Sequence, residues 1–339
     1  MNVYYNVYHC SSCHAELLSQ SLQDSVVCPV CGCSTMSFRN TVMPETPDAV
    51  LPFKVTREQA VKALKDVAAK ASFAPDGLND INVDNVKGVY VPFYAFDIDY
   101  RNTMKLYGVR GKDTTYSMYF LRQADCTYTN ILYDASSLFD DSVSDALNNW
   151  KLNKHLDSLK PFDNDLVGDY FLAPADVPVD KVLPHVIDKA EDMFYHEMVK
   201  SCTQQWDRQV RSISIVKEFP EHSVIAVRRI LLPVWYLNCP CGDRHLTFVI
   251  NGFTKKIAGS IPISRRKVLA KALPKFLIFF IPALPVYYLL LLFNIPGLLF
   301  ALFPLVICAM LWYGAVECYQ NIRKAEKMMK SDVSDRTNQ

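Results

Sequence analysis

Apolar residues recur at helical spacing in three stretches of the chain. Thr56 and Gln59 form a capping-box pattern after a proline-rich segment, so a helix that buries one apolar stripe is expected to begin there. Two further helices are expected across about 142–159 and about 181–209. The longer one carries its apolar stripe at Val182, Val186, Ala190, Phe194 and Met198.

Two segments rich in aromatic and aliphatic residues resemble each other and predict β-hairpins. Segments 89–100 and 230–241 each have a proline at the fourth position, where the start of a strand tolerates it. Each is followed by a second strand-like run, at 103–109 and 245–250. The central part of the chain is therefore interpreted as an α+β body built around two related hairpins.

A long uncharged run near the C-terminus predicts a membrane hairpin. No charged residue lies between Lys275 and Glu317, and a single helix of that length would be about 60 Å long, twice the thickness of a bilayer core. The run is expected to turn at 294–297 and to form two transmembrane spans, 276–293 and 298–316. Basic residues outnumber acidic ones on both flanks, which predicts cytosolic termini. A re-entrant hairpin is the alternative and has the same orientation.

Composition is consistent with a segment that leaves water. The 339 residues are 50% hydrophobic, and the formal net charge of +1 gives no global attraction to nucleic acid or anionic lipid. The N-terminus lacks a charged region followed by an apolar core, so no signal peptide is expected.

Four of the eleven cysteines have the spacing of a metal site. Cys10, Cys13, Cys28 and Cys31 form the pattern C-x2-C-x14-C-x2-C, which is typical of zinc ribbons. Two such turns can close a tetrahedral shell at about 2.3 Å from the metal, and Gly32 allows a sharp turn after the second pair. Four thiolates leave no position for water, so the expected zinc ion is structural rather than catalytic.

Three neighbours of this pattern, Cys33, His9 and His14, could each replace a ligand, and an accidental spacing of four buried cysteines is a further alternative. Residues 1–50 carry four acidic side chains and Arg39 as their one basic side chain, which argues against phosphate binding by the ribbon. The acidic residues are Glu16, Asp24, Glu45 and Asp48. Nucleic acid is therefore not an expected partner.

Other candidate chemistry is sparse. Asp97 and Asp99 share one face of an expected strand and could bind a cation, although a solvated strand face is the simpler interpretation. Cys239 and Cys241 could hold a metal together with Cys202, act as a redox pair, or occupy a hairpin tip for structural reasons. Because no nucleotide-binding loop or nucleophile motif occurs, the chain is not expected to be an enzyme.

The expected order along the chain follows from these patterns. It is a zinc ribbon at 1–43, a linker at 44–55, an α+β cytosolic body at 56–264, a basic flank with the transmembrane hairpin at 265–318, and a cytosolic tail at 319–339.

Several strings resemble a family of bacterial membrane proteins, the TFIIB-type zinc-ribbon proteins, which are sometimes mislabelled as primosomal helicase-like. They are the paired C-x2-C motifs and segments 51–60, 73–76, 87–93, 232–236 and 249–262. The resemblance implies zinc on the same four cysteines and no catalytic residues. It also implies flotillin-like or phage-shock-type scaffolds as partners, whereas Cys239-Pro-Cys241 departs from the family pattern.

Together these patterns predict a noncatalytic, zinc-stabilised adaptor in the cell membrane. Two spans would hold it in the lipid bilayer with both termini in the cytosol, and its body would recruit or anchor cytosolic proteins. The alternatives are a membrane-associated nucleic-acid-binding protein that uses the ribbon, and a thiol redox protein that uses Cys239 and Cys241.

Overall fold

The protein is mostly β-structure. The computed structural model describes residues 3–22, 27–34, 36–70, 78, 81–110, 116–138, 144, 147, 152–168, 170–206, 210–241, 244–259, 264, 266–267, 270, 274 and 320. The strands are β1 (Tyr5–Cys10), β2 (Glu16–Ser19), β3 (Met36–Val42), β4 (Ala49–Val50), β5 (Val86–Arg110), β6 (Tyr116–Asp134), β7 (Lys160–Pro161), β8 (Phe171–Leu172), β9 (Val210–Cys241), β10 (Arg244–Asn251) and β11 (Ile257–Ala258). The helices are α1 (Arg57–Lys70), α3 (Asn164–Val167) and α4 (Val179–Trp206), with 3-10 turns η2 (Val83–Asn85), η3 (Leu152–Lys154) and η4 (Leu156–Ser158).

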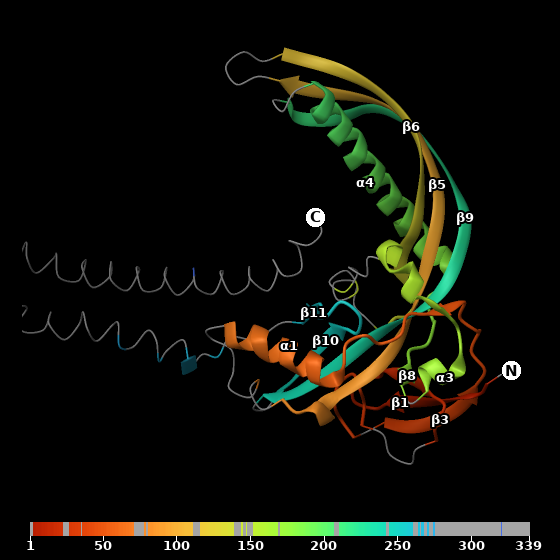
Figure 1. Ribbon diagram of the computed structural model, residues 1–339, viewed down its shortest axis with the longest axis vertical. Helices are drawn as coiled ribbons and strands as arrows, with labels where there is room; N and C mark the ends of the chain where they lie inside the picture. Colours follow the sequence, from red (N-terminus) through yellow and green to blue (C-terminus); the bar gives the residue numbers. More distant parts are fainter. Residues whose placement is uncertain are drawn as a thin grey trace, which may run out of the picture.

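The described strands form one 11-stranded mixed sheet with the main order β11-β10-β9-β5-β8-β2-β1-β3. Its longest members form a three-stranded ribbon, in which β5 pairs antiparallel with β9 on one side and with β6 on the other. The ribbon is strongly curved, and α4 lies along its concave side (Figure 1). The strands of the N-terminal cysteine segment, β1 to β3, join the same sheet, because β2 pairs with β8 at Leu18 and Leu172.

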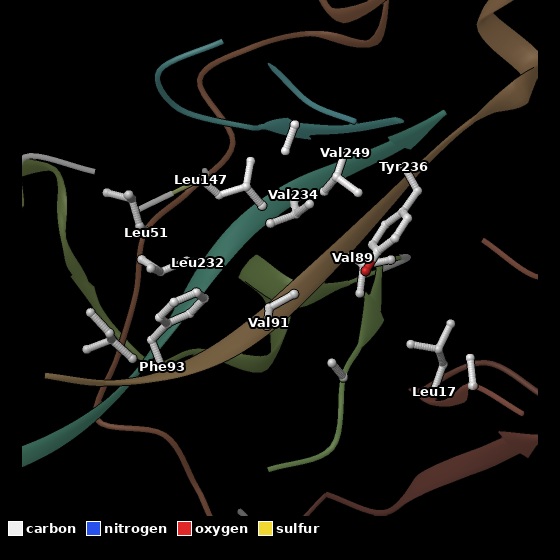
Figure 2. Packing of buried hydrophobic residues seen from close by; sticks show 14 of the residues in the cluster. Leu17, Leu51, Val89, Val91, Phe93, Leu147, Leu232, Val234, Tyr236 and Val249 are labelled. Atoms are coloured by element: carbon white, nitrogen blue, oxygen red, sulfur yellow. The ribbon is translucent and has the colours of Figure 1, made fainter. Parts of the chain in front are cut away.

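The apolar side chains fill four buried clusters around this sheet. In the central one, Val89 and Val91 of β5 lie beside Leu232 and Val234 of β9 (Figure 2). A second cluster lies between α4 and the ribbon, and a third lies between α1 and the β9–β10 pair. The high apolar content of the described residues therefore has a clear use in packing helices against the sheet.

Two of the helices expected from periodicity are confirmed. Helix α1 begins with a reciprocal capping box, in which the Thr56 N–H donates to Gln59 Oε1 and the Gln59 N–H donates to Thr56 Oγ1, both at 3.3 Å. Helix α4 buries the expected apolar stripe, including Val186 and Phe194, against the ribbon. By contrast, the predicted helix at 142–159 is wrong at its C-terminal end, where the chain forms the short turns η3 and η4.

The first of the two expected hairpins is wrong. Its intended arms, 89–100 and 103–109, are parts of the single strand β5, which pairs with β6 instead. The second hairpin is present as β9 and β10, with His245 opposite Pro240. The two similar segments do not repeat a unit side by side but pair with each other, since Tyr90 lies opposite Pro233.

The side chain of Asn102 allows β5 to continue as one strand where its partner strand carries a proline. It lies opposite Pro220 of β9, which has no N–H to donate to the ladder. The fully buried Asn102 side chain compensates, because Oδ1 accepts from the Phe219 N–H at 3.0 Å and Nδ2 donates to Glu218 Oε2 at 3.2 Å. A polar residue that resembles a turn in the sequence is thus a built part of the strand pair.

The expected α+β class and the C-terminal transmembrane hairpin both need correction. A large mixed sheet dominates the described residues, and none of their helices is long and apolar enough to cross a membrane. The predictions of two spans and of a cell-membrane location are therefore contradicted. The predicted spans 276–293 and 298–316 themselves lie outside the described residues.

Candidate metal centre

The first pair of cysteines lies on a tight knuckle at the end of β1. The Cys10 N–H donates to the Ala15 carbonyl at 3.0 Å, and the His14 N–H donates to the Cys10 carbonyl at 2.9 Å. These bonds turn the chain so that Cys10 and Cys13 reach the same side. His14 closes the turn with a positive φ of 61°, which is uncommon for a residue other than glycine.

The second pair repeats this geometry. The Cys28 N–H donates to the Cys33 carbonyl and the Gly32 N–H donates to the Cys28 carbonyl, both at 2.9 Å. Gly32 occupies the position that corresponds to His14 and has a φ of 76°. The two motifs therefore form matching knuckles, and glycine meets the backbone requirement of the second one without strain.

The four sulfur atoms converge on one point. All lie within 4.8 Å of one another, and Sγ of Cys10 lies 3.6 Å from Sγ of Cys31. The distance between Sγ of Cys13 and Sγ of Cys28 is also 3.6 Å. A disulfide requires about 2.05 Å, whereas the ligands of a tetrahedral zinc site with bonds of about 2.3 Å lie roughly 3.8 Å apart. The arrangement is thus that of a group that could hold a metal ion.

Burial makes the thiolate form of these cysteines costly unless a cation lies beside them. Burial raises the pKa of Cys28 to about 12, and it is also the largest cause of a raised pKa at Cys31. Next to them, burial raises the pKa of Tyr236 well above its usual range, with smaller contributions from Cys28 and Cys13. Since four thiolates are costly in such a place, a metal ion would displace protons and compensate their charge.

The second knuckle is fixed to the body of the sheet. Asn238 and Thr247 face each other across β9 and β10. The Asn238 Nδ2 donates to the Pro29 carbonyl at 2.7 Å, and Thr247 Oγ1 donates to the Val30 carbonyl at 3.0 Å. The distance between Thr247 Oγ1 and Asn238 Oδ1 is 3.0 Å. The four-cysteine group and the β9–β10 hairpin are therefore parts of one hydrogen-bonded unit.

Residues next to the motif have other roles. Cys33, His9 and His14 are not members of the four-sulfur group. Cys33 contributes its carbonyl to the second knuckle, and the rings of His9 and His14 contact each other at 5.8 Å between centroids. The structure therefore brings together the four predicted cysteines.

The two carboxylates considered for a cation are used within the sheet. Asp97 forms an ion pair of 3.0 Å with Arg228 and accepts from the Asn130 N–H at 2.8 Å. Asp99 accepts from Thr127 Oγ1 at 2.6 Å. These contacts tie β5 to its neighbours and account for both carboxylates without a cation.

The structure separates the remaining cysteines. Cys239 is fully buried in the cluster of α1, β9 and β10, whereas Cys202 is fully buried in the cluster of α4 and the ribbon. They do not lie together, so the described residues offer no second metal site that joins them. The Cys241 side chain lies outside the described residues.

Sequence reasoning missed the residues that hold the metal centre in place. Asn238 and Thr247 carry no metal-ligand spacing, and they lie more than 200 positions after the knuckle that they bind. Their only signal in the sequence is that both lie in a segment with the pattern of a hairpin. Their role depends on the three-dimensional approach of the knuckle to β9 and β10.

Comparison with known proteins gives one relative. The chain is 24% identical over 237 residues to a protein of Bacillus subtilis (strain 168) named "Uncharacterized protein YdjG". The match covers 66% of this chain and 66% of the relative, just under two thirds of each. No family model matches the chain, and no solved structure matches it. Membership of the TFIIB-type zinc-ribbon family therefore stays a prediction.

Proposed function

We propose that this chain is a noncatalytic adaptor, stabilised by a structural zinc ion, that recruits or anchors other proteins through its β body. The observation that carries the proposal is the four-sulfur group of Cys10, Cys13, Cys28 and Cys31, fixed to the sheet through Asn238 and Thr247. A metal with four protein thiolates has no open position for water or substrate. Such a site contributes to the fold and not to chemistry.

The choice of zinc rests on the ligand set. Tetrahedral sites with four sulfur ligands hold zinc or iron, and zinc is the usual metal where the site serves only to stabilise a fold. The adaptor part of the proposal rests on the exposed apolar side chains of the long strands, such as Tyr119, Leu121 and Phe219, in the body that such a site would stabilise. Scaffold proteins of the flotillin-like or phage-shock type are the partners suggested by the family resemblance.

The two other hypotheses find less support. Nucleic-acid binding by the predicted zinc ribbon would rely on Arg39, but this residue forms an ion pair with Glu16. A redox function would need an accessible thiol, but Cys239 is completely buried among apolar side chains such as Trp235 and Phe248. The structural adaptor is therefore the better interpretation of the same residues.

The metal is tested by elemental analysis and visible absorption of the full chain purified without added metal. One zinc ion per chain is expected, with no iron-thiolate absorption. Cys13→Ser should lose the metal, whereas Cys126→Ser, at a partly exposed cysteine outside the group, should keep it. Bound iron, or zinc that Cys13→Ser retains, would contradict the assignment.

The adaptor function is tested by crosslinking and affinity purification of the full chain from the native cells. The same partner protein should be recovered in constant proportion in repeated experiments. Cys13→Ser should reduce its recovery, because the unsupported knuckle weakens the body, and Cys126→Ser should not. A chain that carries zinc but recovers no reproducible partner would count against an adaptor.

A further inference from the structure

The convex face of the three-stranded ribbon carries a cluster of exposed aromatic, aliphatic and basic side chains. In β5, Met104 and Leu106 are buried beneath α4, so the alternate residues point to the opposite, convex face. On that face Lys105 of β5 lies between Leu121 of β6 and Lys217 of β9. Two positions further along β5, Tyr107 lies beside Tyr119 of β6. Two positions before Lys105, Thr103 lies beside Phe219 of β9. We call Lys105, Tyr107, Tyr119, Leu121, Lys217 and Phe219 the outer patch.

The apolar members of the outer patch are exposed to an unusual degree. The exposed fractions are 63% for Tyr119, 71% for Leu121 and 57% for Phe219. Single exposed apolar residues are ordinary, but several that are neighbours across three strands mark an interaction site. Aromatic side chains contribute strongly at the centres of protein interfaces, because they bury a large area with few rotatable bonds.

The outer patch is also ordered before any partner arrives. The Lys105 Nζ lies 4.7 Å from the centroid of the Tyr119 ring, and the Lys217 Nζ lies 4.7 Å from the centroid of the Phe219 ring. The rings of Tyr107 and Tyr119 contact each other at 5.4 Å between centroids. Such contacts lower the entropy that the side chains would lose on binding.

The charge of the outer patch selects its occupant. Neither Lys105 nor Lys217 forms an ion pair with a carboxylate among the described residues. The patch has no acidic member. The next row across the three strands, beyond Phe219, does carry acidic side chains. There Arg101 of β5 forms an ion pair with Asp125 of β6 and lies opposite Glu221 of β9.

Two classes of occupant fit this pattern poorly. A second copy that bound face to face would bring the lysines of both patches together, and like charges repel. Single-stranded nucleic acid would find aromatic rings for stacking but only two lysines, next to the carboxylates of Asp125 and Glu221. Pairing along the β9 edge is also disfavoured, since that edge carries Pro220 and charged side chains.

We propose that the outer patch binds a protein segment that presents apolar side chains flanked by carboxylates, as on an acidic amphipathic helix. This inference rests on the proposed adaptor function and names the chemistry of its partner. The apolar stripe of the segment covers Tyr119, Leu121 and Phe219, while its carboxylates meet Lys105 and Lys217. The carboxylates of the segment lie over these lysines and away from the row of Asp125 and Glu221.

The probe is a synthetic helical peptide of about 18 residues with a leucine and phenylalanine stripe flanked by glutamates. Its control peptide has lysines in place of the glutamates. Fluorescence anisotropy with the zinc-loaded full chain should show binding of the acidic peptide that weakens with added salt, and at least about tenfold weaker binding of the basic one. Equal affinity for the two peptides, or binding of neither, would overturn the proposal.

Variants locate the binding. Leu121→Ser with Phe219→Ser should weaken binding of the acidic peptide at least about tenfold, because both side chains supply interface area. Ile225→Ser is the matched control, since Ile225 is also exposed, at 55%, but is not a member of the outer patch. Ile225→Ser should leave the affinity unchanged, and an equal loss in this variant would contradict the assignment to the outer patch.

Three further outcomes separate this inference from its rivals. Tighter binding of oligothymidylate than of the acidic peptide would overturn it in favour of nucleic acid. Self-association that Leu121→Ser with Phe219→Ser abolishes would overturn it in favour of a second copy. If affinity purification recovers a partner equally well with this double variant, the adaptor function stands and the outer patch is excluded as its site.

Discussion

The side chain of Asn238 donates a buried hydrogen bond of 2.7 Å to the carbonyl oxygen of Pro29, a residue 209 positions earlier in the chain. Pro29 lies between two of the four cysteines, so this bond joins the candidate metal centre to the long strand β9. The sheet thus holds the cysteine knuckle from one side, and a metal ion bound by the four cysteines would hold it from the other. Its stability and that of the body should depend on each other.

Replacing Asn238 with alanine should therefore affect both. The change leaves the Pro29 carbonyl without its donor in a buried place, which costs about 1–3 kcal/mol in the free energy of unfolding. It should also weaken zinc retention against a chelator. Asn40→Ala, on the exposed part of β3, is the matched control and should change neither quantity by more than about 0.5 kcal/mol. Equal stability of the two variants would contradict this role.

Gly32 and His14 occupy corresponding positions in the two knuckles, which allows a paired comparison. Gly32→Ala should destabilise the metal-loaded protein by about 1–2 kcal/mol, because alanine is strained at a φ of 76° and its Cβ would lie 3.0 Å from Cβ of Asn238. His14→Gly should stay within about 1 kcal/mol of the native chain, since glycine accepts the positive φ. Urea denaturation of both variants tests this order, and the reverse order would refute it.

Asn102 should be essential to the ribbon despite being polar. Asn102→Ala removes the acceptor of the Phe219 N–H and the donor to Glu218, and it should lower the free energy of unfolding by about 2–3 kcal/mol. Asn153→Ala, in the exposed η3 turn, removes hydrogen bonds of the same kind at the surface and should cost less than about 1 kcal/mol. Similar losses in both variants would show that the burial of Asn102 is unimportant.

Deprotonation of Tyr100 should lower the free energy of unfolding at alkaline pH. Burial, followed by the charge of Glu191, raises its pKa from 10.0 to about 12. The folded state therefore holds this proton more tightly than the unfolded state, so its contribution is complete below pH 10 and is lost as the pH rises through about 12. Between pH 9 and 11, the native chain should lose roughly 1 kcal/mol more than Tyr100→Phe.

Urea denaturation at the two pH values measures this difference. Tyr119→Phe is the matched substitution at an exposed tyrosine of the same ribbon. It controls for the general effect of removing a tyrosine hydroxyl. If Tyr100→Phe and the native chain lost equal stability between pH 9 and 11, the assignment of this effect to Tyr100 would be wrong.

Local chemistry explains which features could be predicted from the sequence. The cysteine spacing identified all four members of the sulfur group, because a knuckle needs its two ligands at a fixed separation. Thr56 and Gln59 marked the start of α1, because a capping box is contained within four residues. The apolar stripe of α4 was likewise visible, since Val182 to Met198 recur at helical spacing.

Features that depend on distant partners could not be predicted. Arg101 and Asn102 resemble a turn, but Arg101 pairs with Asp125 on the exposed face and Asn102 compensates for Pro220. This is why β5 was divided into two strands in the prediction. The overall apolar composition was similarly ambiguous, because a high apolar content suits both membrane spans and a large buried sheet core. The distinction depends on tertiary packing, which the pattern alone does not contain.

The most direct test of the central claim is hydrogen exchange of the full chain, metal-loaded and after treatment with a chelator. If the metal centre and the sheet form one unit, chelation should raise the exchange of the second knuckle and also of the strand segments that hold Asn238 and Thr247. Helix α4, which packs in a separate cluster, should stay protected. Unchanged exchange around Asn238 and Thr247 after loss of the metal would contradict the account.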